Sequence, residues 1–231
     1  LLAPLAGGAG SEAIARRREL ITAHVAAARA QFVEQSSDSP DGGLMSPGFV
    51  AREMRRAAAG DAVLVDESVT STAFVRTMFG LSEPNSYFYA KGGSLGLGLP
   101  AAVGVKLAMP DRQVICAVGD GSALYSIQAL WTAARYKLAV AFVVFNNASY
   151  MILKGGLLAM RGASAGLGKF VGMDITEPEI DFVSLAASMG VAARRVMDSA
   201  ELRAALDWAF NEGGPTLLDV AIARDVRSVL R

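Results

Sequence analysis

The sequence predicts an α/β fold in which helices cover both faces of a doubly wound parallel sheet. From about residue 44 onward, short and almost continuously apolar segments alternate with longer segments of helical pattern. Strands that are apolar throughout are buried on both faces, which is typical of parallel sheets. At 231 residues and 52% hydrophobic composition, the chain is also long enough to bury a full core.

The first 43 residues are predicted to stand apart from this sheet domain. Residues 11–33 are rich in Ala and Arg, and Ser11 beside Glu12 suits a helix start, so an amphipathic helix is expected there. The next segment, EQSSDSPDGG, collects polar and turn-forming residues and is expected to be a linker or exposed loop. The sheet domain is then expected to span residues 44–231.

Within that domain, the apolar runs and the helical patterns place the elements in order along the chain. Helices are expected over residues 46–58, 99–109, 122–137, 181–190 and 199–213. Strands are expected over residues 61–68, 112–120, 138–147, 191–197 and 215–222.

The composition narrows the classes of partner. Basic and acidic residues number 22 each, so the net charge indicates neither nucleic acid nor an anionic membrane as a partner, and small molecules or other subunits are expected as partners.

The single cysteine, Cys116, lies in the apolar run QVICAVG and is expected to be a buried thiol. No apolar run approaches the ~20 residues of a spanning helix. LLAPLAGGAG lacks the basic start of a signal peptide, so a cytoplasmic location is expected.

The stretch GDGSALYSIQALWTAARYKLAVAFVVFNN, residues 119–147, predicts a metal site. Ligands of such sheets gather beyond the carboxyl ends of the strands. If the strands over 112–120 and 138–147 are neighbours, Asp120 and Asn147 face one site. A carboxylate and an amide oxygen suit Mg²⁺ or Ca²⁺ and not zinc.

The same stretch predicts a phosphate site beside the metal. Mg²⁺ commonly completes its octahedral shell with water and phosphate oxygens. Gly119 and Gly121 allow close backbone approach, and Ser122 is expected to open a helix whose free N–H groups face the anion. Gly-Asp-Gly alone is equally good as a turn, and the paired Asn residues at this distance make the pattern specific.

This pattern resembles the signature of thiamine-diphosphate-dependent enzymes. From about Leu44 to its C-terminus, the chain is similar to the C-terminal diphosphate-binding domain of that family. GDGSALYSIQALWTAARY and PAAVGVKLAMPDRQVI resemble the benzoylformate decarboxylases most. The resemblance implies thiamine diphosphate and Mg²⁺ (or Ca²⁺) as cofactors, and the thiamine-diphosphate-binding fold.

The resemblance also implies which residues form the site. Asp120, Asn147 and the backbone carbonyl of Ser149 are the expected metal ligands. In KGGSLGLGLP, Gly93 and Leu95 match positions whose backbone binds the aminopyrimidine, although an ordinary flexible loop is the alternative. Leu95 is also expected to wedge under the thiazolium. Contacts along the diphosphate are expected from Val69, Thr70, Gly119, Gly121, Ser122 and Tyr150.

Several other residues have structural as well as functional interpretations. Ile152 and Leu153 either line the substrate pocket or begin a buried helix. His24, the only histidine, lies on the Arg-rich helix and is expected to be solvated. Glu67 and Asp219 are expected to be hydrogen-bonding residues at strand ends, not catalytic acids.

The resemblance implies that this chain holds half of an active site. In the family, a Glu of a separate pyrimidine-binding domain activates the cofactor, often across a dimer interface. No such domain is found in this sequence, so no catalytic residue is expected in it. The Leu at position 1 indicates a fragment of a longer protein, with the smaller subunit of a split enzyme as the alternative. A homodimer or homotetramer is expected.

The leading functional prediction is thiamine-diphosphate- and Mg²⁺-dependent decarboxylation of a 2-oxo acid. The alternatives are an acetolactate-synthase-like carboligase, a cofactor-binding module without activity, and a simpler nucleotide-binding protein. After Tyr150, the sequence MILKGG and the Gly-rich interval up to residue 182 differ from the benzoylformate decarboxylases, so an aromatic substrate is not implied. The Gly-rich interval is expected to act as a mobile cover.

Overall fold

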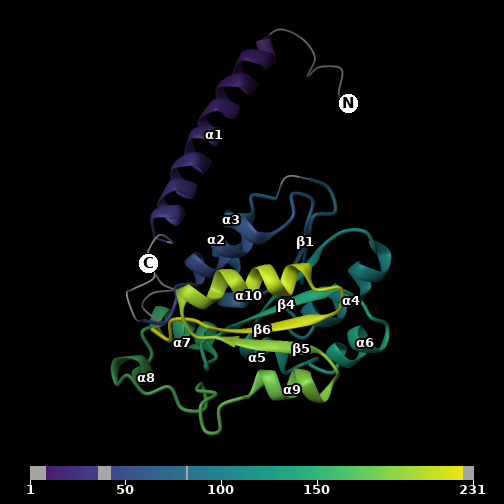
Figure 1. Cartoon of the computed structure of the whole chain (residues 1–231). Helices are drawn as coiled ribbons and strands as arrows, with labels where there is room; N and C mark the ends of the chain where they lie inside the picture. Colours follow the sequence, from purple (N-terminus) through teal and green to yellow (C-terminus); the bar gives the residue numbers. More distant parts are fainter. Residues whose placement is uncertain (1–8, 36–42, 82, 226–231) are drawn as a thin grey trace.

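The computed structural model describes residues 9–35, 43–81 and 83–225, and within them the strands form one parallel sheet (Figure 1). The strand order is β2-β1-β3-β4-β6-β5, and all neighbouring pairs are parallel. The predicted parallel sheet is therefore confirmed. The strands are β1 (Val63–Glu67), β2 (Tyr87–Tyr89), β3 (Val114–Gly119), β4 (Val140–Asn146), β5 (Ala192–Val196) and β6 (Thr216–Ala221).

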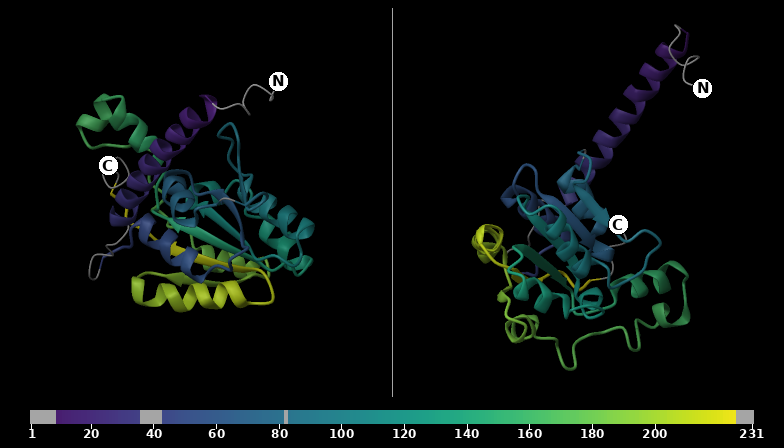
Figure 2. Two further views of the ribbon diagram at one scale, coloured as in Figure 1. Left: turned by 90° about the horizontal axis from the view of Figure 1, so that it is seen from above. Right: turned by 90° about the vertical axis from the view of Figure 1, so that its right-hand side faces the viewer.

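Helices pack on both faces of the sheet, as Figure 2 shows from two further directions. Alternate strand residues point to opposite faces: Leu64 packs on one side, and Val63 and Val65 pack on the other. The first face is covered by α2 (Pro47–Ala57), α3 (Thr72–Phe79) and α10 (Ser199–Asn211). The second face is covered by α4 (Gly98–Ala108), α6 (Ala129–Arg135) and α9 (Phe182–Ser188). The doubly wound architecture is confirmed.

The strand order places a topological switch point between β1 and β3. The chain leaves β1 toward β2 on one side, whereas β3, β4, β6 and β5 lie on the other side. Ligands of open α/β sheets bind in the crevice beyond the carboxyl ends of the strands at such a point. The loops that follow β1, β3 and β4 therefore form the expected binding edge.

Two segments of the domain differ from the predicted elements. The helix expected over 122–137 is divided into α5 (Asp120–Ala123) and α6, joined by tight turns such as Ser126 N to Ala123 O. The hydropathy pattern does not distinguish these tight turns from a continuous helix. Strand β2, helix α3 and the short 3₁₀ turn η2 (Val69–Ser71) were not predicted, because β2 has only three residues and α3 follows a run of β-branched residues.

Helix α1 (Ala9–Gln35) extends away from the sheet domain (Figures 1 and 2). A helix here was predicted, but Ser11 lies inside it, and its polar and apolar side chains are spread around all faces, so the amphipathic prediction is wrong. His24 is exposed, as expected. Phe32 packs edge-on against Phe74 of α3, with 5.4 Å between ring centroids. Most of the predicted linker, residues 36–42, lies outside the described residues.

No helix in the described part of the chain is both long and apolar enough to cross a membrane. The remaining helices, α7 (Met151–Ala159) and α8 (Ala163–Gly166), belong to the long interval between β4 and α9.

Candidate metal and phosphate site

The two loops that carry Asp120 and Asn147 meet at the carboxyl edge of the sheet. Strands β3 and β4 are neighbours, with Gly119 paired to Phe145, so the condition for a shared site is met. Asp120 is buried, and its Oδ1 accepts a hydrogen bond from the Gly121 amide at 2.8 Å. Its Oδ2 accepts from the Ser149 amide at 3.3 Å, which joins the loop after β3 to the loop after β4.

The consecutive residues Asn146 and Asn147 have different surroundings. Asn146 donates from Nδ2 to Asp219 Oδ1 at 2.8 Å and accepts at Oδ1 from the Ala148 amide at 3.0 Å. Asn147 is also buried, but its Oδ1 has no hydrogen-bond partner among the described residues. A buried acceptor without a partner costs about 1–3 kcal/mol. The Asn147 backbone amide donates to the Asp120 carboxylate, so a cation bound by both side chains would satisfy this oxygen, and the residues present fit a metal.

The backbone of this turn brings further donors to the carboxylate. Ala148 adopts a left-handed conformation with φ 52°, which turns the chain sharply after the two asparagines. Burial raises the pKa of Asp120 to about 6, and hydrogen bonds from the amides of Gly121, Ala148, Ser149 and Asn147 oppose that rise. A bound cation would favour the charged carboxylate and reverse the effect of burial.

Glycines provide close approach at the predicted phosphate side. A Cβ added to Gly119 would lie 3.8 Å from the Ser68 carbonyl oxygen, so the loops after β1 and β3 are in contact. A Cβ added to Gly121 would lie 2.7 Å from Cε1 of Tyr150, so the tyrosine ring packs directly on this glycine. Ser122 is buried inside α5, which begins at Asp120 and not at Ser122 as predicted.

The loop after β1 contributes the other predicted phosphate contacts. Val69 and Thr70 lie in η2, which contacts both β3 and α7. Val69 has a positive φ of 53°, which is uncommon for a β-branched residue. The structure therefore brings Val69 and Thr70 to the same edge as Asp120, Asn147, Ser149 and Tyr150.

Gly93 and Leu95 lie in an exposed loop before α4. The carboxylate of Glu67 holds this loop by accepting hydrogen bonds from the Gly96 amide at 2.5 Å and from the Gly98 amide. Glu67 is thus a hydrogen-bonding residue at a strand end, as predicted. Leu95 is half exposed, and none of the described contacts joins it to the Asp120 site.

Helix α7 begins where the substrate-pocket residues were predicted. Met151 is buried, with 2% of its surface exposed, and anchors the start of the helix. Ile152 and Leu153 are each 53% exposed. They therefore do not begin a buried helix, and they remain available to line a pocket.

Residues 173–176 form a strap beside the site that the sequence did not predict. The Met173 carbonyl oxygen accepts hydrogen bonds from the Tyr150 amide and from Ser149 Oγ, both at 2.9 Å. Ile175 donates from its amide to the Ala148 carbonyl oxygen at 2.8 Å, and Asp174 forms an ion pair with Lys154. The strap belongs to the Gly-rich interval, whose composition carries no signal for these contacts.

Comparisons with known proteins match most of this chain. The model of the family described as "Thiamine pyrophosphate enzyme, C-terminal TPP binding domain" matches residues 68–220. A benzoylformate decarboxylase of Pseudomonas aeruginosa is 38% identical over 182 residues, which cover 78% of this chain and 33% of the relative. A Mycobacterium tuberculosis protein, provisionally named as an acetolactate synthase large subunit, is 37% identical over 206 residues, which cover 85% of this chain and 40% of the relative.

A solved structure shows the same fold. The thiamine diphosphate-dependent 4-hydroxybenzoylformate decarboxylase of Rhodococcus jostii RHA1 matches with a TM-score of 0.75 and 38% identity. The match covers 82% of this chain and 34% of that chain. The chain therefore spans 40% or less of the length of these three relatives.

Proposed function

Because the chain belongs to the thiamine pyrophosphate enzyme family and matches its C-terminal cofactor-binding domain, we propose that it supplies the diphosphate and metal half of an active site that decarboxylates a 2-oxo acid. The observation that carries the metal part of this proposal is that buried Asn147, whose backbone amide donates to the Asp120 carboxylate, has an Oδ1 without a partner among the described residues. A hard-oxygen pair of this kind suits Mg²⁺ or Ca²⁺.

Each loop of the site has a part in holding the cofactor. Asp120, Asn147 and the carbonyl of Ser149 would bind the metal, and Gly121 would allow the diphosphate to approach the backbone. When bound, thiamine diphosphate supplies the electron sink that the decarboxylation of a 2-oxo acid requires. The further contacts along the diphosphate are proposed from Val69, Thr70, Gly119, Ser122 and Tyr150, and those to the aminopyrimidine from Gly93 and Leu95.

A second candidate function is the ligation of two carbonyl compounds, as in acetolactate synthases. The relative of that name covers a larger share of this chain than the benzoylformate decarboxylase does, 85% against 78%. The products distinguish the two reactions, because a decarboxylase releases an aldehyde whereas a carboligase forms a new carbon–carbon bond. A cofactor-binding module without activity would give neither product.

We also propose that a pyrimidine-binding domain, with an activating Glu, completes the site from another part of the protein or another subunit. The proposed assembly is a homodimer or homotetramer in the cytoplasm. Exposed aromatic side chains on and around α6 support a contact surface of this kind, because such residues are enriched in protein interfaces. They are Tyr125, Trp131 and Tyr136.

Calorimetric titration of thiamine diphosphate into the purified chain, with Mg²⁺ present, tests the proposal. We expect saturable binding that is lost in Asp120→Ala and retained in Asp207→Ala, which removes an exposed carboxylate on α10. Equal binding by the two variants would contradict the metal assignment. Absence of binding by the unaltered chain would show that this half of the site needs the pyrimidine-binding domain to hold the cofactor.

A further inference from the structure

The turn that follows β1 has a strained residue at a predicted cofactor contact. Val69 adopts a left-handed conformation with φ 53°. That conformation is disfavoured for an L-residue by roughly five- to thirtyfold in population. Strain of this kind persists only where the surrounding structure holds it, and it is typical of functional sites.

The carboxylate of Asp66 holds the chain on both sides of Val69. Asp66 lies in β1 and is 3% exposed. Its Oδ1 accepts hydrogen bonds from the Ser68 amide at 2.9 Å, from Ser68 Oγ at 2.6 Å and from Thr72 Oγ1 at 3.3 Å. Ser68 and Thr72, which flank Val69 in the sequence, are thus hydrogen-bonded to the same buried oxygen.

The other oxygen of Asp66 reaches the edge strand. Its Oδ2 accepts a hydrogen bond from the hydroxyl of Tyr87 at 2.8 Å, and Tyr87 pairs with Leu64 where β2 joins β1. Burial, together with the charge of Asp66, raises the pKa of Tyr87 above its usual range, so the hydroxyl remains a donor.

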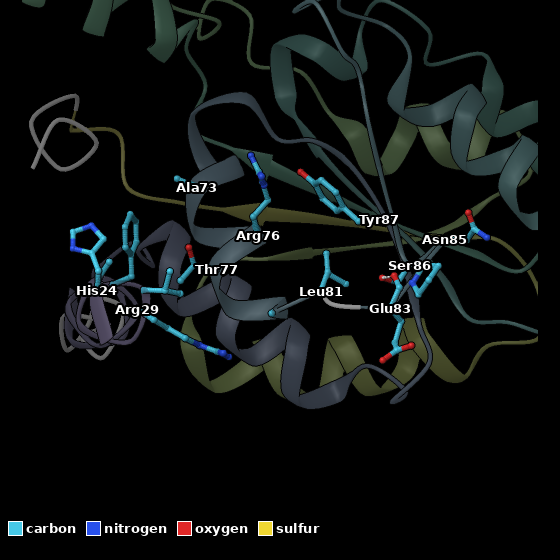
Figure 3. Close-up of a pocket in the computed structure, with 15 residues that line it drawn as sticks. His24, Arg29, Ala73, Arg76, Thr77, Leu81, Glu83, Asn85, Ser86 and Tyr87 are labelled. Carbon is cyan, nitrogen blue, oxygen red and sulfur yellow. Dashed lines mark hydrogen bonds between the residues drawn. The ribbon is translucent and has the colours of Figure 1, made fainter. Parts of the chain in front are cut away.

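The ring of Tyr87 lies at one end of a groove between α1 and the edge of the sheet. The guanidinium of Arg76 lies 5.6 Å from the centroid of that ring and 5.7 Å from the ring of Tyr89. Figure 3 shows Tyr87 and Arg76 pointing toward one another in this groove, which His24 and Arg29 of α1 line on the opposite side. The edge strand is therefore joined to the turn at Val69 by a continuous set of contacts.

We propose that Asp66 and Tyr87 are positioning residues that hold the left-handed backbone at Val69 and so preform the turn that contacts the cofactor diphosphate. We call the set Asp66, Ser68, Thr72 and Tyr87 the Asp66 clasp. This inference rests on the proposed function. If the turn adopts its binding conformation in only a fraction of the molecules, the apparent affinity for the cofactor falls in proportion to that fraction. Loosening the clasp therefore lowers cofactor affinity, although neither Asp66 nor Tyr87 is among the expected cofactor contacts.

The first experiment measures the turn without any cofactor. The Ser71 amide donates to the Ser68 carbonyl oxygen at 3.0 Å, and this bond encloses Val69, so hydrogen exchange at Ser71 reports on the turn. In Tyr87→Phe we expect exchange to be faster by about tenfold, the effect of losing one charge-assisted hydrogen bond. Tyr89→Phe is the matched control, because its hydroxyl is not among the described donors to Asp66. Equal exchange rates in the two variants and the unaltered chain would overturn the clasp.

The second experiment links the clasp to the cofactor through a double-mutant cycle. With Val69 present, Tyr87→Phe is expected to weaken the binding of thiamine diphosphate and Mg²⁺ by about three- to tenfold. In the Val69→Gly background the loss should be less than about twofold, because glycine adopts positive φ without strain. Equal losses in both backgrounds would assign Tyr87 to general stability and overturn the proposal.

The two experiments also separate failure of the clasp from failure of the proposed function. If Asp120→Ala binds thiamine diphosphate and Mg²⁺ as tightly as the unaltered chain does, the metal site of the proposed function fails, whereas the exchange rate at Ser71 still decides whether the clasp exists. Tyr87→Phe retains the ring that packs beside Arg76, so the variant is expected to fold, and its melting temperature checks this.

Discussion

Asn146 donates a hydrogen bond to the buried carboxylate of Asp219 across the β4–β6 pair, at 2.8 Å from Nδ2 to Oδ1. This bond occupies the side chain of the first of two consecutive asparagines, whereas the second, Asn147, has a side-chain oxygen without a partner in the described part of the chain. Asp219 therefore supports the proposed metal site indirectly, by holding the conformation of the turn that carries Asn147.

Asp219→Ala is expected to destabilise the chain by about 1–3 kcal/mol, because it leaves the buried amide of Asn146 without its acceptor. Asp219→Asn retains an oxygen for that bond and should cost less. Urea denaturation of both variants measures the difference. Equal losses of stability in the two variants would show that the bond to Asn146 does not determine the effect.

The stability of the metal-free chain should depend on pH through Asp120. Because burial raises its pKa to about 6, the folded chain binds this proton more tightly than the unfolded chain does. Its contribution to the free energy of unfolding is therefore complete below pH about 4 and is lost as the pH rises to about 6, by on the order of 2–3 kcal/mol.

Denaturation of the unaltered chain and of Asp120→Asn between pH 4 and pH 8, without divalent cations, tests this pH dependence. The variant should lack that part of the fall in stability. Added Mg²⁺ should stabilise the unaltered chain more strongly above pH about 6, where the carboxylate is charged, and should not stabilise the variant. Parallel pH curves for the two proteins would contradict the prediction.

Gly121→Ala should weaken cofactor binding while leaving the fold intact. The new Cβ would lie 2.7 Å from the ring of Tyr150, which is partly exposed and can move away from its place on the site. Gly104→Ala is the matched control, because Gly104 is exposed in α4 with open space around it. That control should gain roughly 0.5–1 kcal/mol of stability without loss of affinity. Unchanged affinity in Gly121→Ala would exclude close backbone approach at this position.

Glu67→Gln should loosen the loop that contains Gly93 and Leu95. The two carboxylate oxygens accept hydrogen bonds from the Gly96 and Gly98 amides. A glutamine has only one oxygen, so its side-chain NH₂ group would face one of these two backbone N–H donors. We expect the free energy of unfolding to fall by about 1–3 kcal/mol and proteolysis between residues 91 and 98 to become faster. An unchanged rate of cleavage there would show that the loop is held by other contacts.

Much of the fold follows from local patterns in the sequence. The apolar runs around Val65, Cys116 and Val143 predicted central strands because each is buried on both faces. The edge strand at Tyr87 was missed because its three residues are only partly buried and carry little pattern. The segment 122–137 was predicted as one continuous helix because the tight turns between α5 and α6 have the same hydropathy pattern as a helix.

The candidate site was predictable to a similar extent. Asp120 and Asn147 each follow a predicted strand, and the observed pairing of β3 with β4 met the condition under which the sequence predicted a shared site. The strap at residues 173–176 could not be predicted, because its contacts with Ser149 and Tyr150 arise from backbone groups that any residue carries.

The sequence alone was sufficient for the α/β class and the central strands, and it supplied the residue types of the proposed metal site, because hydropathy pattern and chain order are read directly from the residues. The tertiary structure decided which asparagine keeps a free oxygen and which residues fasten Val69. Those outcomes depend on hydrogen bonds between residues 73 positions apart, Asn146 and Asp219, and 21 positions apart, Asp66 and Tyr87. Only the pairing of strands in the sheet brings such residues together.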